Sequence, residues 1–155
     1  MKKYELTEET FTVFGKTLYR IRAVRDFGSV KTGEFGGYIE KEENLSHFGN
    51  AWISGDARVF GDARVSGNAR VFGNAEVFNT RHFFVQGPIG SRDGYVTFYR
   101  TKDDTVEVRC GCFSGSLQEF VNQVEETHGG SRYEKEYKLA AELAKVCIRL
   151  EGESR

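Results

Sequence analysis

A six-residue repeat between residues 49 and 78 constrains the fold of this 155-residue chain more than any other feature. Five consecutive copies read GNAWIS, GDARVF, GDARVS, GNARVF and GNAEVF. Each copy begins with glycine and Asn or Asp, continues with alanine, and has an aliphatic residue two positions after the alanine. Self-similarity at a fixed period is the signature of a repeat architecture, so the rest of the chain is interpreted around it.

Each copy predicts one very short strand and one sharp corner. Successive side chains of a strand point to opposite sides, so in Ala57-Arg58-Val59 the alanine and valine share one side. Glycine and Asn or Asp tolerate left-handed backbone, which supplies the corner. A strand this short cannot pair its backbone groups with its sequence neighbour, so we expect parallel pairing with a copy further along the chain.

The repeat resembles the hexapeptide repeat of left-handed parallel β-helices. The stretches FGGYIEKEENLSHFGNAW, RCGCFSGSLQEF and THGGSRYEKEY are also similar to those of hexapeptide-repeat proteins encoded by phages and prophages. The resemblance implies that three hexapeptides, about 18 residues, form one triangular coil. It places Arg58 under Glu76, Phe60 under Phe78 and Trp52 under Arg70, and it puts Ser46, Arg64 and His82 on the third face.

The expected fold class is mainly β, with an α+β module at the C-terminus. Residues 1–32 are interpreted as a β cap, because TFTVF and TLYRIRAV flank a two-residue hairpin signal, Gly15-Lys16. Residues 33–86 are expected to form a short left-handed parallel β-helix of about three coils. In its degraded first coil Ile39 and Leu45 keep the inward phase, and residues 41–44 form an outward bulge.

Residues 87–155 are expected to form a ββαα module. GYVTFYR (94–100) and TVEVRC (105–110) predict a hairpin. Two capping boxes, Ser116-x-x-Glu119 and Ser131-x-x-Glu134, each precede an apolar pattern of helical period. Gly129-Gly130 separates the two helices.

Composition narrows the functional classes. The net charge of −1 at pH 7 gives no global electrostatic argument for nucleic-acid binding. Three cysteines, with Cys110 and Cys112 close together, argue against a disulfide framework. The N-terminal MKKYELTEET lacks the apolar run of a signal peptide, and no stretch has the length of a membrane span. We therefore expect a protein of the cytoplasm of a bacterial host cell.

Histidine is the residue on which an enzymatic interpretation depends. Hexapeptide-repeat acyltransferases and zinc carbonic anhydrases use histidines at subunit interfaces, and this chain has His47, His82 and His128. No carboxylate is clearly placed with His47 and His82, and zinc needs three or four converging ligands, so no metal and no other cofactor is predicted. An acyltransferase would use His47 or His82 as its base. The resemblance also implies more coils and a looped insertion for such an enzyme, and the sequence has neither.

The outward positions of the repeat provide the candidate surface. Contiguous exposed aromatic side chains usually mark an interface, and three phenylalanines follow inward aliphatic residues. We expect a homo-oligomer, by resemblance a trimer, with the interface residues Arg58, Phe60, Phe72, Glu76 and Phe78. The alternative is that the chain's own cap or C-terminal helices cover these aromatics. The candidate ligand-binding residues, in clefts between protomers, are Trp52, Arg64, Arg70 and His82. Arg20, Arg22, Arg25 and Lys31 are interpreted as a solvated strand face.

The leading functional hypothesis is a non-enzymatic, homo-oligomeric binding protein. The resemblance to phage-encoded chains implies an accessory protein that counters host defence, by binding a host protein or by sequestering a small signalling nucleotide. Two alternatives remain open, a reduced hexapeptide-type acyltransferase and a structural or assembly protein. A copurifying small molecule or host protein would distinguish among them.

Overall fold

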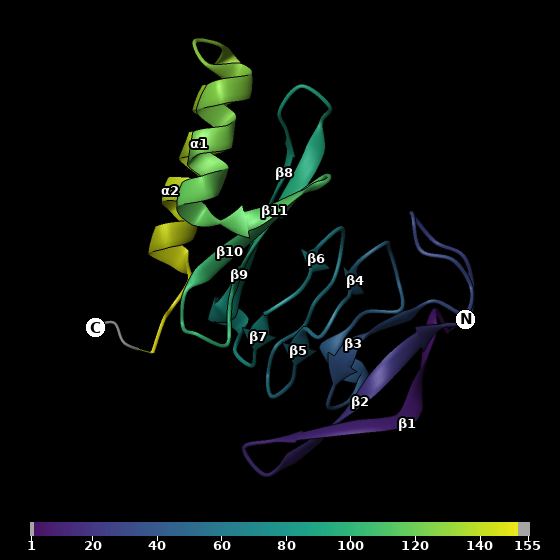
Figure 1. Ribbon diagram of the computed structural model, residues 1–155. Helices are drawn as coiled ribbons and strands as arrows, with labels where there is room; N and C mark the ends of the chain where they lie inside the picture. The colour runs from purple at the N-terminus through teal and green to yellow at the C-terminus, as the bar shows by residue number, and fades with distance from the viewer. Residues whose placement is uncertain (1, 152–155) are drawn as a thin grey trace. The chain divides into compact units, whose positions relative to one another are not determined.

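The computed structural model describes residues 2–151, which divide into two compact units (Figure 1). The N-terminal unit extends to Thr80, and the C-terminal unit begins at Arg81. The first contains the repeat and the strands that precede it. The second contains an antiparallel sheet and two helices.

A long antiparallel hairpin opens the N-terminal unit. β1 (Tyr4–Val13) pairs with β2 (Lys16–Ala23), and β2 pairs on its other edge with β3 (Phe35–Ile39). Phe14 and Gly15 form the turn with φ angles of 50° and 75°. Two residues of positive φ match the twist of a tight hairpin. The predicted hairpin is formed, but its turn lies one residue earlier than Gly15-Lys16, and Lys16 begins β2.

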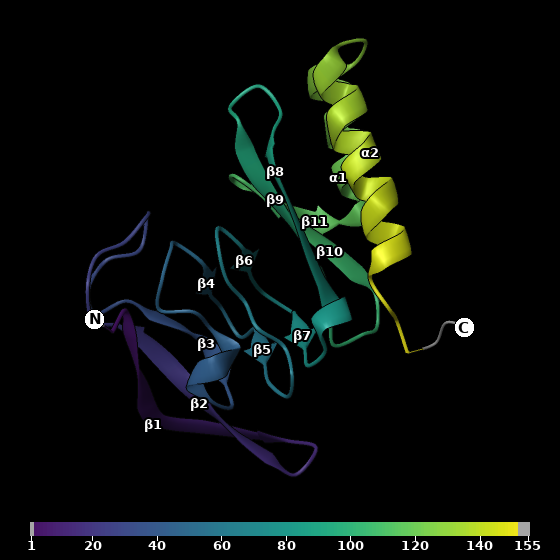
Figure 2. The same cartoon turned by 180° about the vertical axis from the view of Figure 1, so that it is seen from behind.

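The repeat forms two-residue parallel strands, which Figure 2 shows from behind. They are β4 (Trp52–Ile53), β5 (Arg58–Val59), β6 (Arg70–Val71) and β7 (Glu76–Val77). β5 lies between β3 and β7, while β4 pairs with β6. The alanines and aliphatic residues of the repeat are all buried, as the alternation predicts. The register places Arg58 opposite Glu76 and Trp52 opposite Arg70, which confirms these two expected pairs.

The expectation of a left-handed parallel β-helix of about three coils as the main fold is wrong. The five-stranded sheet has the order β1-β2-β3-β5-β7 and is mixed, with antiparallel pairing up to β3 and parallel pairing beyond it. The parallel strands are short, so the long hairpin supplies most of the pairing. The hairpin within residues 1–32 belongs to the same sheet as the repeat strands, because β2 pairs with the edge of β3 that would otherwise be exposed.

The first layer of the repeat region is longer than the sequence pattern predicts. Its residues pair with those of the second layer as Tyr38 with Arg58, Ile39 with Val59 and Leu45 with Val65. In the next pair, Trp52 and Arg70 are separated by two fewer residues along the chain than the members of each earlier pair. The first layer therefore contains two extra residues between Leu45 and Trp52. The bulge expected at 41–44 is thus at 46–50, where Phe48 is 82% exposed, and Glu42–Asn44 form the 3-10 helix η1.

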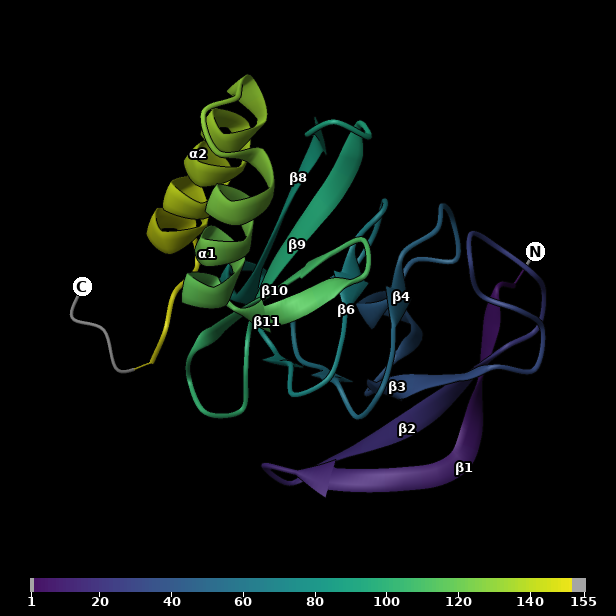
Figure 3. The same ribbon diagram turned by 45° about the horizontal axis from the view of Figure 1, so that its top comes forward.

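Four antiparallel strands and two helices make up the C-terminal unit. The strands are β8 (Phe83–Ile89), β9 (Gly94–Arg100), β10 (Val106–Cys110) and β11 (Phe113–Ser116), in the order β11-β10-β9-β8. A 3-10 helix, η2 (Thr80–His82), precedes them. α1 (Leu117–His128) and α2 (Arg132–Cys147) lie on one side of this sheet (Figure 3). Both predicted helices are confirmed, and the Ser116–Glu119 capping box is formed.

The expected ββαα module is corrected to four strands followed by two helices. Residues 83–86, assigned from sequence to the repeat region, begin β8, and Gly87-Pro88 continues that strand instead of breaking it. β8 is an edge strand, where a proline needs no ladder donor. Cys110 and Cys112 flank Gly111 in the tight turn from β10 to β11, at a glycine φ of 57°. No helix in residues 2–151 has the length and apolarity needed to cross a bilayer.

Candidate binding site

Two of the three aromatic residues expected at an oligomer interface, Phe60 and Phe78, lie against the chain's own hairpin. Phe60 is 2% exposed and stacks on Phe78 with ring centroids 5.0 Å apart. Leu18 and Tyr38 are buried with Phe60, and Phe11 of β1 packs against them. The chain's own N-terminal strands therefore cover Phe60, which is the alternative that the sequence left open.

The charged pair beside these aromatics is also used within the chain. The Arg58 Nη1 atom lies 3.3 Å from Oε2 of Glu76, and its guanidinium carbon lies 3.9 Å from the centre of the Phe11 ring. Glu76 is buried, and the ion pair joins β5 to β7 within the repeat, while the cation–π contact holds the hairpin on the repeat. Phe72 is half-buried and packs near Gly55 at a repeat corner, away from this pair.

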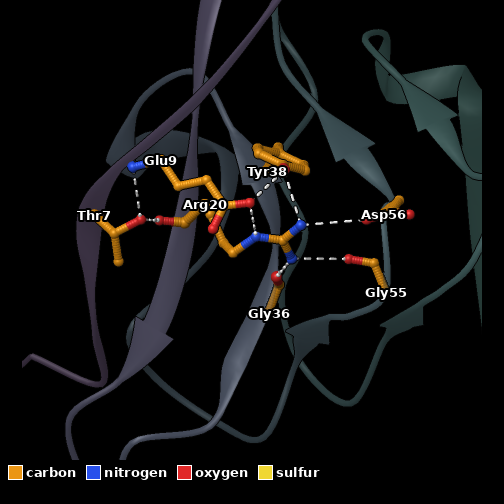
Figure 4. A network of polar contacts seen from close by, with 7 residues as sticks. All are labelled: Thr7, Glu9, Arg20, Gly36, Tyr38, Gly55 and Asp56. Carbon is orange, nitrogen blue, oxygen red and sulfur yellow. Dashed lines mark hydrogen bonds and ion pairs between the residues drawn. The ribbon is translucent and has the colours of Figure 1, made fainter.

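Arg20 is the centre of a polar network that ties the hairpin to β3 and to a repeat corner (Figure 4). Its Nε donates to Glu9 at 2.9 Å, its Nη1 donates to the Gly36 carbonyl at 2.7 Å, and its Nη2 donates to Tyr38 at 2.8 Å and Asp56 at 3.2 Å. Tyr38 donates in turn to Glu9 at 3.0 Å. Each nitrogen of this guanidinium has an acceptor, and two carboxylates balance its charge. We interpret the network as a structural clamp.

The same network perturbs the Glu9 carboxyl. Hydrogen bonds from Arg20 and then from Tyr38 hold the pKa of Glu9 below its ordinary value. The charged form of Glu9 is therefore the form that the hairpin favours. The donors and acceptors of this network are matched, so the network needs no further ligand.

A second cationic group, the Arg25 cluster, consists of Lys3, Arg25, Phe27 and Trp52. The Lys3 Nζ atom lies 4.7 Å from the centre of the Phe27 ring, and the Arg25 guanidinium carbon lies 5.9 Å from it. Trp52 packs edge-on against Phe27 with ring centroids 5.2 Å apart. The N-terminus, the loop between β2 and β3, and the first repeat copy therefore meet at Phe27.

Donors outnumber acceptors in the Arg25 cluster. Lys3 donates to the Ala51 carbonyl at 2.7 Å, and Arg25 Nη2 donates to the His47 carbonyl at 3.1 Å. Nε of Arg25 and Nε1 of Trp52 are buried without a hydrogen-bond partner. Buried polar groups are normally paired, so these two donors need an acceptor that the chain does not provide.

Positive charge in the Arg25 cluster is also uncompensated. Within residues 2–151 neither Lys3 nor Arg25 has a carboxylate at ion-pair distance, in contrast to Arg20. Burial, and after it the charge of Arg25, lower the pKa of Lys3 to about 8. An anion beside these two side chains would offset their repulsion and accept from the unpaired donors.

The four residues that the sequence predicts as ligand-binding do not lie together in the structure. Trp52 belongs to the Arg25 cluster, and Nη2 of Arg70 borders it, 3.5 Å from the position that a Cβ on Gly28 would take. Arg64 is exposed and lies apart on the repeat, and His82 is buried in η2. Sequence reasoning therefore found the Trp52–Arg70 pair but not the residues that complete the cluster.

Sequence reasoning missed Lys3, Arg25 and Phe27 for an identifiable reason. The sequence predicts Arg25 on a solvated strand face with Arg20 and Arg22, yet β2 ends at Ala23, and the Arg25 side chain reaches the His47 carbonyl just before the first repeat copy. The loop between β2 and β3 has no sequence periodicity from which the positions of its side chains could be predicted. The only usable signal is Asp26, whose carboxylate accepts from Thr32 and closes the loop.

His47 is held by both ring nitrogens. Its Nδ1 accepts from the Lys3 backbone N–H at 3.0 Å, so its Nε2 carries the proton and donates to Glu42 at 2.8 Å. The ring also stacks on Tyr4 at a centroid distance of 4.1 Å. A histidine fixed in this way anchors the N-terminus and is not positioned as a general base. In the described part of the chain, no cluster of three or more His, Cys, Asp or Glu side chains could hold a metal ion.

Comparison with known proteins assigns no family to this arrangement. The sequence matches no protein-family model and none of the curated proteins. The likeness to hexapeptide-repeat proteins therefore remains a prediction from the sequence.

Proposed function

We propose that this protein is a non-enzymatic binding protein that holds a small phosphate-bearing ligand of the nucleotide class at the Arg25 cluster. The observation that carries the proposal is the pair of buried, unpartnered donors, Arg25 Nε and Trp52 Nε1, beside two cations without a carboxylate. A phosphate group has several acceptor oxygens and negative charge. It can therefore accept hydrogen bonds from the two unpaired donors and also balance the charge of the two cations.

The surroundings of the cluster favour a small ligand over a macromolecule. Phe27 and Trp52 are both less than a tenth exposed, which excludes a broad docking surface at this place. Arg70 borders the cluster from the next layer of the repeat, so a ligand larger than one phosphate group would meet another cation there. Arg25 and Phe27 both belong to the loop between β2 and β3, so this loop has to admit the ligand.

Binding is favoured over acyl transfer because of His47. Both of its ring nitrogens are committed to the N-terminus and to Glu42, so the alternative of a reduced acyltransferase gains no support from this residue. The wider setting, an accessory protein of an infected bacterial cell that counters host defence by sequestering a signalling nucleotide, rests on the sequence resemblance and forms part of the proposal. A host protein as the partner is the competing outcome.

Trp52 makes the proposal directly testable because it is the only tryptophan of the chain. Its fluorescence therefore reports on the cluster alone. We expect a saturable change on titration with adenosine monophosphate, and a weaker one with inorganic phosphate. Arg25→Gln should raise the dissociation constant roughly tenfold to hundredfold, because it removes a charge-assisted hydrogen bond.

Arg22→Gln is the matched control, since Arg22 is an exposed cation of the same segment that pairs with Glu5. It should bind like the wild type. Mass spectrometry of the purified protein adds a second measurement of what it carries from the cell. No fluorescence change with either probe, together with a stoichiometric host protein and no bound small molecule, would contradict the proposal.

A further inference from the structure

The members of the Arg25 cluster differ in how far they are exposed. Lys3 is 0% exposed, and Phe27 and Trp52 are buried as well. Arg25 is half-buried and is the most exposed of the four. A ligand therefore meets the cluster at Arg25, and only its leading group comes within reach of the buried donor of Trp52.

The loop between β2 and β3 limits the space around the cluster. Phe27 and Val30 exchange backbone hydrogen bonds, which closes the tip of this loop. Gly28 at the tip has a φ of 53°, and a Cβ there would lie 3.5 Å from Arg70 Nη2 and from the Asn50 side chain. The loop tip therefore lies against the repeat and closes that side of the cluster.

Lys3 and Arg25 together present two positive charges to one small space. The Lys3 Nζ atom and the Arg25 guanidinium carbon lie 4.7 Å and 5.9 Å from the centre of the same Phe27 ring. Burial, and after it Arg25, lower the pKa of Lys3 only to about 8, so Lys3 keeps its proton at pH 7. A group with two negative charges balances both cations, whereas a group with one negative charge leaves a net positive charge.

The carboxylates of the neighbouring segments are engaged elsewhere. Asp26 accepts from the N–H and the hydroxyl of Thr32, both at 2.8 Å. Glu42 accepts from His47 at 2.8 Å and from Lys2 at 3.3 Å. Among residues 2–151 neither carboxylate pairs with a cation of the Arg25 cluster. The balancing charge therefore has to come from the ligand.

We propose, resting on the proposed function, that the ligand presents a terminal phosphate monoester to the Arg25 cluster and that phosphodiesters bind poorly there. A monoester has three free oxygens and carries close to two negative charges at pH 7. A diester has one charge and a substituent on each side, and the loop tip at Gly28 obstructs the second substituent. The ligand class is a nucleotide with a free terminal phosphate, as opposed to a cyclic nucleotide.

Three adenine nucleotides that differ at the phosphate test this choice through the fluorescence of Trp52. They are adenosine monophosphate, its phosphate methyl ester and 3′,5′-cyclic adenosine monophosphate, measured at one pH and one ionic strength. We expect both diesters to have a dissociation constant about tenfold or more above that of the monoester, the equivalent of one charge-assisted hydrogen bond. Equal affinities would overturn this proposal and leave the phosphate site in place, whereas binding of none of the three would overturn both.

A substitution of Lys3 tests the role of charge. Lys3→Met should weaken the binding of the monoester about tenfold and that of the methyl ester about threefold or less, so the preference between the two ligands falls. Lys2→Met is the matched control, since Lys2 is an exposed neighbour that pairs with Glu42, and it should keep the preference of the wild type. A folded Lys3→Met protein, checked by circular dichroism, that keeps the full preference would overturn the proposal.

The phosphorus resonance of bound adenosine monophosphate gives a measurement that needs no substitution. The second ionisation of a free phosphate monoester lies near pH 6. In the complex we expect it about one pH unit lower or more, because two cations favour the dianion. Protein groups that titrate in this range affect the methyl ester equally, and since that ligand has no second ionisation it is the reference. A bound phosphate that titrates at or above the pH of the free one would overturn the proposal.

Discussion

The repeat and α2 differ in whether the chain covers their outward-facing apolar residues. In the repeat the chain covers Phe60 and Trp52 itself: the β1–β2 hairpin lies on Phe60, and the loop after β2 places Phe27 against Trp52. In the C-terminal unit the outer face of α2 has no such cover, and Leu139 and Val146 stay exposed. The difference teaches that the covered aromatic positions of the repeat serve the fold.

Both units bury polar side chains beside an apolar core. In the C-terminal unit Val96, Phe98 and Val108 from the sheet pack under the helices, and Thr97 and Arg100 of the same sheet are buried as well. In the N-terminal unit Lys3 and Asn44 are buried and donate to backbone carbonyls of the repeat region. These two side chains therefore tie the N-terminus and η1 to the repeat.

The largest expected effect comes from a charge in the stacked interior of the repeat. Val59→Asp should prevent the N-terminal unit from folding, because Val59 is fully buried between layers and an unpaired carboxylate there has no compensation. Arg64→Ala, on the exposed side of the same repeat, should change the free energy of unfolding by less than about 0.5 kcal/mol. Thermal melts of both variants measure this, and similar melts for the two would refute the inward and outward assignment.

Truncating the apolar core of the C-terminal unit should have the next largest effect. Phe98→Ala removes a buried ring that contacts Phe84 and Phe120, so we expect a loss of about 3–5 kcal/mol in the free energy of unfolding. Leu139→Ala should cost far less, because that side chain is exposed. Denaturant unfolding measures both, and an equal cost would show that α2 is covered on both sides.

Breaking the Arg20 clamp should have a moderate effect. Arg20→Met keeps much of the side-chain volume but removes the bonds to Gly36, Tyr38 and the two carboxylates, and we expect a loss of about 1–3 kcal/mol. Arg22→Met, at a more exposed ion pair, should cost less than about 1 kcal/mol. Equal costs for the two variants would mean that the matched network contributes no more than a surface ion pair.

The last prediction concerns pH. The folded-state pKa of Lys3 is about 8 and its ordinary value is 10.5, so between these values the unfolded chain binds more protons and stability rises with pH. The rise should end near pH 10, where burial keeps Tyr4 and Tyr99 neutral in the fold while their unfolded forms ionise. Unfolding measured from pH 8 to 10 should show this rise in the wild type. Lys3→Met should lack it, and a rise of the same size in that variant would assign it to another group.

Much of the local structure follows from the sequence, and the reasons are local. Alternation identified the buried residues of the repeat, and the Ser116–Glu119 capping box fixed the start of α1. The parallel register of Arg58 with Glu76 followed from the repeat length that the resemblance implied. Each of these depends on a short sequence interval.

The fold class and the completed site did not follow, because they depend on contacts between distant segments. No periodicity indicates that β1 and β2 join the repeat strands in a mixed sheet, or that Arg25 lies beside Phe27, which packs on Trp52. Two extra residues between Leu45 and Trp52 shifted the phase of the first layer, and a proline on an edge strand resembled a break. In each case a tertiary contact decided the outcome.

The most direct test of the account is the indole N–H resonance of Trp52, which is a single peak because the chain has one tryptophan. In the ligand-free protein the Nε1–H has no acceptor. On addition of adenosine monophosphate we predict a downfield proton shift and slower hydrogen exchange at this peak, with no such change in Arg25→Gln. An indole resonance that stays in place while the nucleotide binds elsewhere, or that never responds, would contradict the assignment of the Arg25 cluster as the ligand site.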